Sequence, residues 1–241
     1  MRALALFLAL AGCAGGNAAL EPSLVHRVLF IGNSLTYFND LPGTVAQLAS
    51  STNETVVIAS VARPNFALID HVSGESDAVE VIQEGDWDYV VLQQGPSSLD
   101  LSRNTLIHAT RLLNPYIRAA GGRSALLMVW PESTRFEFFD EVRVSYQLAA
   151  REVDGLFLPA GEAWLEAWAI DSQLQLYGPD GYHPSALGTY LAALVVYEGI
   201  TGRDARSLPA DGAGRRLGVP TTQVRLLQQA AHQAVVRFAG H

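Results

Sequence analysis

The sequence predicts an α/β domain, a three-layer α/β/α sandwich built on a five-stranded, mainly parallel sheet. Five short apolar runs rich in β-branched residues alternate with longer segments of helical period, which is the rhythm of a parallel sheet with crossover helices. Each run is apolar at nearly every position, as expected for strands covered by helices on both faces. With 241 residues, 49% of them hydrophobic, the chain can bury one sizeable core. We therefore expect a single domain at 25–241.

The expected strands and helices can be placed along the chain in order. The strands are RVLFIG at 27–32, TVVIASV at 55–61, DYVVLQ at 88–93, SALLMVW at 124–130 and GLFLPA at 155–160. The helices are expected at 41–51, 75–85, 101–120, 135–153, 161–170, 185–199 and 222–238. The stretch 208–220, LPADGAGRRLGVP, has the composition of a linker. Ligands of open α/β sheets bind at the carboxyl ends of the strands, so we look for the site there.

The first residues, MRALALFLALAGC, have the composition of an export signal: Arg2, then an apolar run, then Cys13. The run is shorter than the roughly 20 apolar residues that a spanning helix needs. Its end resembles the lipobox of bacterial lipoproteins, which implies that Cys13 is acylated, that 1–24 is signal and tether, and that this lipid is the only membrane attachment. Ala14 after the cysteine favours an exported protein of the outer membrane. The alternative is an ordinary secretory signal with an incidental cysteine.

The charge balance excludes some classes of partner. Only 17% of the residues are charged, and the net charge is -8, so no basic surface is expected for a nucleic acid. We find no cluster with metal-ligand spacing and no glycine-rich phosphate loop, so neither a metal nor a cofactor is expected.

Ser34 stands directly after the first predicted strand, in FIGNSLTYFND. A serine hydroxyl is a poor nucleophile unless a positioned base takes its proton. Among six histidines, His183 is the best candidate, because YGPDGYHPSALGTY is a loop that leads into a helix and places Asp180 three residues earlier. The carboxylate can hold one ring nitrogen while the other faces the serine. His71 has an ambiguous context, and the other four histidines have contexts typical of surface or packing positions.

These segments resemble two motif blocks of the SGNH/GDSL hydrolases. Gly32-Asn33-Ser34-Leu35 is similar to the first block and Asp180-Gly181-Tyr182-His183-Pro184 to the last, in the family's order. The resemblance extends from about Arg27 to Gly202. Within the superfamily, the chain resembles a bacterial subgroup of exported proteins. It implies a flavodoxin-like SGNH fold in which Ser34 is the nucleophile, His183 the base and Asp180 the residue that orients it.

The sequence departs from the family at the oxyanion hole. The family uses the backbone N–H of the serine, that of a second-block glycine and a third-block asparagine side chain; only the Ser34 N–H carries over directly. After the second strand, Asn65 is the candidate for the glycine position, since asparagine tolerates the left-handed conformation, or it merely shapes the turn. After the third strand, Gln93 or Gln94 is the candidate donor, since successive strand residues face opposite ways. Both can instead be polar strand ends.

The resemblance implies a serine esterase acting on carboxylic esters, with O-acetyl groups on carbohydrates as the favoured substrate. Two alternatives remain: a lysophospholipase or other lipid esterase, and a catalytically weak, lipid-anchored carbohydrate-binding protein. Glu132 and Arg63 are weak candidates for substrate contacts. The tryptophans offer a sugar-stacking platform, although such residues are more often core.

Overall fold

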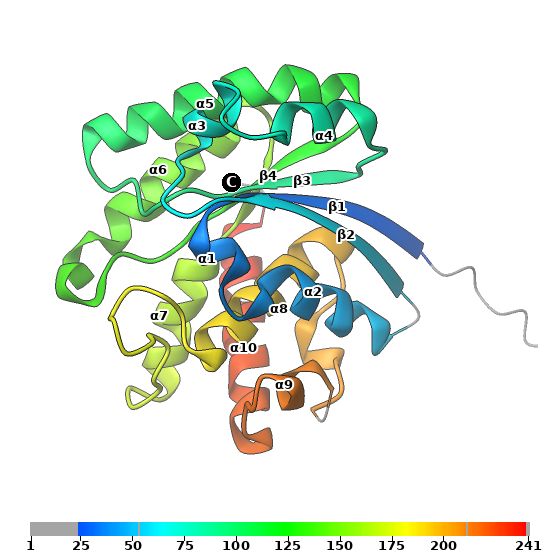
Figure 1. Cartoon of the computed structure of the whole chain (residues 1–241). Helices are drawn as coiled ribbons and strands as arrows, with labels where there is room; N and C mark the ends of the chain where they lie inside the picture. The colour runs from blue at the N-terminus through cyan, green and yellow to red at the C-terminus, as the bar shows by residue number, and fades with distance from the viewer. Residues whose placement is uncertain (1–23, 53, 211, 240–241) are drawn as a thin grey trace, which may run out of the picture.

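A computed structural model describes residues 24–52, 54–210 and 212–239, and it confirms the predicted three-layer sandwich (Figure 1). The middle layer consists of β1 (Leu24–Gly32), β2 (Glu54–Ala62), β3 (Tyr89–Leu92), β4 (Arg123–Leu127) and β5 (Leu156–Leu158). Each strand overlaps one of the predicted apolar runs. The predicted signal and lipobox, with Cys13, lie outside the described residues.

The sheet has the order β2-β1-β3-β4-β5, and every neighbouring pair is parallel. This is the flavodoxin-like order, in which the chain reverses direction of travel between β1 and β3. All carboxyl ends therefore meet at one edge of the sheet. The register of β1 on β3 runs from Val28↔Tyr89 to Ile31↔Leu92, which places the residues that follow both strands side by side.

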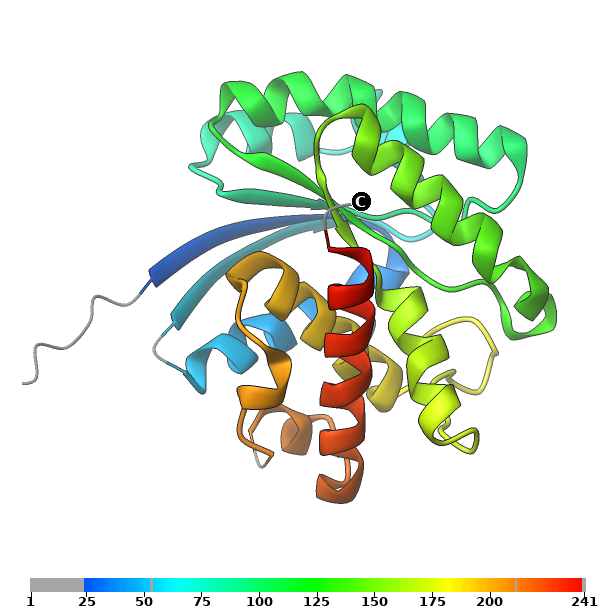
Figure 2. The same ribbon diagram turned by 180° about the vertical axis from the view of Figure 1, so that it is seen from behind.

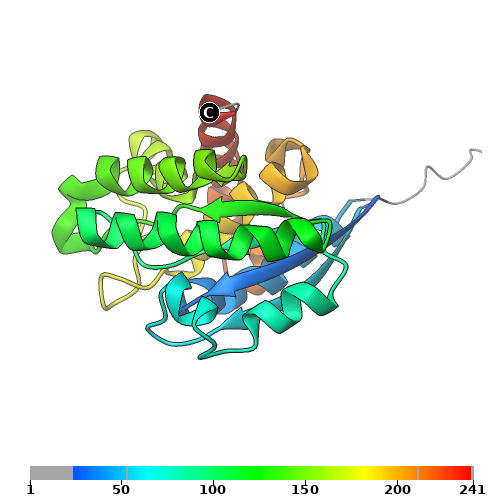
Figure 3. The same ribbon diagram turned by 90° about the horizontal axis from the view of Figure 1, so that it is seen from above.

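Helices cover both faces of the sheet, as the apolar strands require. On one face lie α3 (Leu68–Val72), α4 (Ala78–Glu84), α5 (Asp100–Ala119) and α6 (Phe139–Glu152), which Figure 3 shows across the sheet. On the other face lie α2 (Leu41–Ser50), α7 (Ala160–Ile170), α8 (Ala186–Thr201) and α10 (Thr221–Phe238), which Figure 2 shows from behind. Helix α8 is buried on nearly every side, because it is enclosed by α2, α7 and α10.

Two predicted segments differ from the structure. The helix expected at 135–153 begins as a 3-10 turn, η2 (Ser133–Phe138), and becomes α-helical only in α6, because Arg135 has the non-helical angles φ -129° and ψ 36°. The linker expected at 208–220 is packed: Leu208 and Val219 are buried, and a short helix, α9 (Ala213–Arg216), lies between them. Gly214 lies within α9, Gly218 has φ +73° in the turn after it, and Pro220 is the N-cap of α10.

The short helices α1 (Ser34–Tyr37), η1 (Phe38–Asp40) and η3 (Ala205–Ser207) have no periodic pattern that predicts them. In the described part of the chain, no helix has the length and apolar character needed to span a membrane.

Candidate active site

The turn from β1 into α1 presents Ser34 at the carboxyl edge of the sheet. Asn33 is the N-cap of α1, and its side-chain oxygen accepts a hydrogen bond from the Leu35 N–H at 3.1 Å. Its side-chain nitrogen donates to the Phe66 carbonyl at 2.9 Å, which links the turn to the segment after β2. Asparagine is a favoured N-cap because its oxygen satisfies a free helical N–H. The sequence therefore fixes Ser34 at the first position of a short helix.

The structure brings the three predicted residues Ser34, His183 and Asp180 into one hydrogen-bonded chain. Ser34 Oγ lies 2.8 Å from His183 Nε2. On the other side of the ring, His183 Nδ1 lies 2.5 Å from Asp180 Oδ2. With a proton on Nδ1, the ring donates to the carboxylate and accepts the serine hydroxyl hydrogen at Nε2. This is the tautomer that a general base needs.

Asp180 is held in its charged form although its side chain is half exposed. Its second oxygen, Oδ1, accepts from the N–H groups of Tyr182 and His183 at 3.0 and 2.9 Å. The hydrogen bond from the His183 ring, followed by that from the Tyr182 N–H, lowers the pKa of Asp180 to about 2. Asp180 is therefore ionised at neutral pH and stabilises an imidazolium beside it.

The Asp180–His183 loop is fixed from several sides. Gly181 has φ +68°, a left-handed conformation that glycine adopts without strain, and its carbonyl accepts from the Ser133 N–H at 2.8 Å. The indole Nε1 of Trp130 donates to the Tyr182 carbonyl at 3.0 Å. The segment after β4 thus carries the loop, so the position of His183 depends on the end of another strand.

Two residues that the sequence analysis did not single out support the imidazole. The Phe38 ring stacks on His183, with ring centroids 4.5 Å apart and planes at 23°. Asn39 has φ +52°, and its side-chain nitrogen donates to the Pro184 carbonyl at 2.9 Å. Both belong to η1, just after the nucleophile helix. No local pattern predicts these contacts, because they join segments about 145 positions apart.

Two backbone N–H groups in the turns after β1 and β2, those of Ser34 and Asn65, are the candidate donors to an oxyanion. The Ser34 N–H stands at the first position of α1, where no intrahelical acceptor exists. Asn65 has φ +62°, so it adopts the left-handed conformation expected at the glycine position. Within the described residues, neither N–H has an acceptor. Asn65 also lines the same hollow as Asn33.

The donor role expected for Gln93 or Gln94 finds no support in the geometry. The Gln93 amide nitrogen donates to Asn33 Oδ1 at 3.0 Å and to the Gln94 carbonyl at 2.6 Å. The Gln94 amide nitrogen donates to Ser97 Oγ at 2.8 Å and reaches the Ser102 carbonyl at 3.4 Å. An amide has two hydrogens, so both side chains use theirs inside the protein.

Trp130 and Trp164 belong to the core, and Trp87 and Trp168 are half-buried and packed against it. The rings of Trp130 and Trp164 are stacked with centroids 3.6 Å apart, and both are buried. They do not offer an exposed platform for a sugar. Of the two weak candidates for substrate contacts, Glu132 lines the hollow beside the triad, whereas Arg63 is exposed and does not.

Among the hollows in the described part of the chain, three lie at the carboxyl edge of the sheet, where Ser34 stands, and a fourth lies elsewhere. The first, of about 390 Å³, is lined by both apolar and polar groups, and the polar ones include Asn65, Ser98, Glu132 and Arg135. It shares residues with an apolar hollow of about 310 Å³ that Leu99 and Leu101 line. A third, of about 520 Å³, lies on the other side of the triad loop and is lined by residues that include Phe38, Asp180 and His183.

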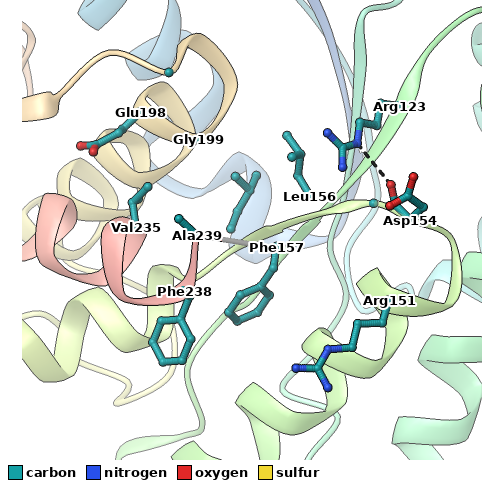
Figure 4. A pocket seen from close by; sticks show the side chains of 13 residues that line it. Arg123, Arg151, Asp154, Leu156, Phe157, Glu198, Gly199, Val235, Phe238 and Ala239 are labelled. Atoms are coloured by element: carbon teal, nitrogen blue, oxygen red, sulfur yellow. Dashed lines mark hydrogen bonds between the residues drawn. The ribbon is translucent and has the colours of Figure 1, made fainter. Parts of the chain in front are cut away.

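The fourth hollow, of about 550 Å³, lies at the opposite edge of the sheet, where β4 and β5 begin (Figure 4). Its lining includes Arg123, Arg151 and Phe238, and the Arg123 side chain donates to the Asp154 carbonyl at 3.2 Å. The length of the strands separates it from Ser34, so it takes no part in the chemistry of the triad.

One group of metal-ligating side chains comes together in the described ranges. Ligand atoms of Glu198, Asp204 and His232 lie within 4.8 Å of one another. They already have partners: His232 Nδ1 lies 2.7 Å from Glu198 and 3.3 Å from Asp204, and Arg206 forms a salt bridge with Asp204 at 2.6 Å. The Arg206 hydrogen bond lowers the pKa of Asp204 to about 2. The group is best described as a salt-bridge network that joins α8, η3 and α10.

Comparison with solved structures identifies the fold of the chain. No family model matches the chain, and no curated protein matches it. Among solved structures, a DUF4886 family protein from Bacteroides uniformis superposes with a TM-score of 0.75 at 20% identity, covering 88% of this chain and 95% of its own. A protein from Slackia heliotrinireducens assigned as an SGNH hydrolase gives 0.63 at 24% identity, covering 73% and 98%. The chain has the SGNH/GDSL hydrolase fold.

A third similar structure is a catalytic mutant of an acetylxylan esterase from Geobacillus stearothermophilus. It superposes with a TM-score of 0.53 at 17% identity, covering 74% of this chain and 95% of its own. At these identities the likeness establishes the fold, which confirms the sequence prediction. What the SGNH fold does in this chain depends on its own side chains.

Proposed function

We propose that this chain is a serine ester hydrolase in which Ser34, His183 and Asp180 form the catalytic triad. The observation that carries the proposal is the continuous hydrogen-bonded chain, with Ser34 Oγ 2.8 Å from His183 Nε2 and His183 Nδ1 2.5 Å from Asp180 Oδ2. A serine, a base and an orienting carboxylate within hydrogen-bond reach are the combination that activates a hydroxyl. The intact triad favours an enzyme over the carbohydrate-binding alternative.

The proposed reaction has two halves. His183 takes the hydroxyl proton as Ser34 attacks the ester carbonyl, and the Ser34 and Asn65 N–H groups stabilise the negative oxygen of the tetrahedral intermediate. The imidazolium, stabilised by Asp180, then gives its proton to the leaving alcohol. In the second half, His183 deprotonates a water molecule that attacks the acyl-serine. The bond between the acyl carbon and Ser34 Oγ then breaks, Oγ takes the proton back from His183, and the carboxylic acid is released.

The hollow beside the triad favours a polar alcohol portion. Its lining includes Asn65, Ser98, Glu132 and Arg135, which offer hydrogen bonds and charges beside apolar groups such as Leu99. An acetylxylan esterase has the same fold. We therefore propose short acyl esters of carbohydrates, O-acetyl groups above all, as the substrate class.

A lipid esterase is the second candidate, and one observation favours it. The hollow that Asn65 and Arg135 line lies next to an apolar hollow, where Leu99 and Leu101 are 54% and 82% exposed. Hydrolysis rates for acetylated xylan and for long-chain esters or lysophospholipids would separate the two. Faster turnover of the long-chain esters would favour the lipid substrate.

The activity is tested with Ser34→Ala. We expect wild-type protein to hydrolyse p-nitrophenyl acetate and to be labelled at Ser34 by a fluorophosphonate, and the variant to do neither while its unfolding curve stays unchanged. Equal hydrolysis by the variant would refute the assignment. Saturable binding of a glycan by a wild-type protein that resists labelling would favour the catalytically weak binding protein.

The place of action that we propose is the bacterial cell envelope. The MRALALFLALAGC segment predicts export and a lipid on Cys13, and Ala14 after it favours the outer membrane. A lipid at this cysteine would tether the hydrolase domain by the residues that precede β1.

A further inference from the structure

Gln93 makes three hydrogen bonds to the turn that holds Ser34, to Asn33 and Thr36. It follows β3, its side chain is fully buried, and all four of its closest polar contacts lie in the turns after β1 and β3. Buried amides that are fully hydrogen-bonded fix local geometry, because losing one partner leaves an unsatisfied group.

The carbonyl end of Gln93 holds the residues on both sides of Ser34. Its Oε1 accepts from the Asn33 N–H at 3.0 Å and from Thr36 Oγ1 at 2.6 Å. Asn33 precedes the nucleophile and Thr36 lies in the first turn after it. One oxygen thus spans the nucleophile from its N-cap to its helix.

The amide end of Gln93 orients the capping oxygen. Its Nε2 donates to Asn33 Oδ1 at 3.0 Å, the same oxygen that accepts from the Leu35 N–H at 3.1 Å. The other hydrogen goes to the Gln94 carbonyl at 2.6 Å. Turning this amide toward a substrate would break two hydrogen bonds and release the cap of α1.

The sheet register makes this approach possible. Ile31 pairs with Leu92, so Gly32 and Gln93 stand next to each other at the ends of β1 and β3. A Cβ on residue 32 would lie 2.4 Å from Gln93 Oε1, a distance that real contacts do not show. Because Gly32 has no side chain, the Gln93 side chain can reach the turn that holds Ser34.

We propose that Gln93 is a positioning residue that aims Ser34 at His183, and that it is not a donor to the oxyanion. The inference rests on the proposed esterase function and deepens it. It leaves the negative oxygen of the intermediate to backbone N–H groups, those of Ser34 and Asn65.

The direct test is the crystal structure of the protein after reaction with a short-chain fluorophosphonate. In that reaction Ser34 Oγ bonds to phosphorus, fluoride leaves and His183 takes the hydroxyl proton. We expect Gln93 Nε2 to keep its bonds to Asn33 Oδ1 and the Gln94 carbonyl, with the phosphonyl oxygen facing backbone N–H groups only. A hydrogen bond from Gln93 Nε2 to the phosphonyl oxygen would overturn the proposal.

Kinetics supply a second test, with Gln94→Met as the matched control. Gln93→Met should lower kcat about 100-fold with little change in KM, the loss typical of misplacing a reacting group by about 1 Å. Thr36→Val should also lower kcat. The double variant should have the same kcat as Gln93→Met alone, because both changes remove the hydrogen bond between Thr36 and Gln93.

The control makes the same chemical change one position along the chain. Gln94 is also buried, but its amide bonds Ser97 and Ser102 in the segment after β3. The losses from Gln94→Met and Thr36→Val should therefore multiply. Multiplying losses for Gln93→Met and Thr36→Val would contradict the proposal.

The experiments distinguish an incorrect esterase assignment from an incorrect role for Gln93. If wild-type protein neither hydrolyses esters nor reacts with the fluorophosphonate, the esterase assignment fails. The role of Gln93 is then tested by crystal structures of Gln93→Met and Gln94→Met. We expect displacement of the 33–36 turn only in the former, and an unchanged turn there would overturn the inference.

Discussion

Adding one methyl group at Gly32 should slow catalysis far more than the size of the group suggests. The Cβ of Gly32→Ala would lie 2.4 Å from both Gln93 Oε1 and Thr36 Oγ1, whereas contacts under 3.0 Å are essentially never found. The atoms must therefore separate by at least about 0.6 Å, and neither neighbour has free space, because both are buried and bonded to each other at 2.6 Å.

The expected loss follows from this displacement. Misplacing a reacting group by about 1 Å costs about 100-fold in rate, so a shift of about 0.6 to 1 Å should lower kcat by about 10- to 100-fold. In activation free energy this is about 1.4 to 2.7 kcal/mol. Overpacking a buried site should also lower the free energy of unfolding by about 1 to 3 kcal/mol.

The assay measures kcat and KM with p-nitrophenyl acetate and stability by urea unfolding. Gly212→Ala is the control, because an added Cβ there would meet no atom nearer than 3.7 Å. We expect the control to match wild type in kcat, whereas the ψ of -125° at Gly212, which residues with a side chain disfavour, costs it some stability. Wild-type kcat together with wild-type stability in Gly32→Ala would refute the description of the nucleophile turn as tightly packed.

Three other perturbations test separate parts of the structure. Asp180→Asn should lower kcat by about 10⁴-fold, because the amide cannot stabilise the imidazolium of His183; a loss below about 10-fold would count against the triad. Burial lowers the pKa of His71 below 6.5, so the unfolded chain takes up a proton that the folded chain does not, and stability should fall as pH drops below about 6.5. Urea unfolding at pH 7 and pH 5 should show less of this loss in His71→Gln, and equal losses would contradict the reasoning. When the full chain is expressed in a bacterium and subjected to detergent phase separation, wild-type protein should enter the detergent phase and Cys13→Ser the aqueous phase. Identical partitioning of the two proteins would exclude a lipid on Cys13.

The sequence was sufficient for the sheet and for the three residues of the proposed triad. Strands buried on both faces must be apolar throughout, so five such runs separated by helical segments already define a parallel sheet. Ser34 and His183 were found because each stands in a local motif whose composition sets it apart. Their order along the chain then matched one family.

The sequence alone did not decide whether the side-chain amide of Gln93 or Gln94 donates to the oxyanion. Gln93 and Gln94 have the same chemistry and adjacent positions, and either can serve as a donor on paper. The register of β1 on β3 decides between the possible partners, because it sets Gln93 beside Gly32 and Asn33. Register is a property of two strands together, so neither strand's sequence contains it.

The sequence by itself determined the layers of this protein, since hydrophobic period is a local property of the chain. It also determined the residue types that the chemistry requires. Only the tertiary structure decided that Ser34 meets His183 across 149 positions and that Phe38 stacks on the same ring. The physical reason is that such contacts depend on where whole strands and loops come to rest, and a hydrogen bond forms or fails within a few tenths of an ångström.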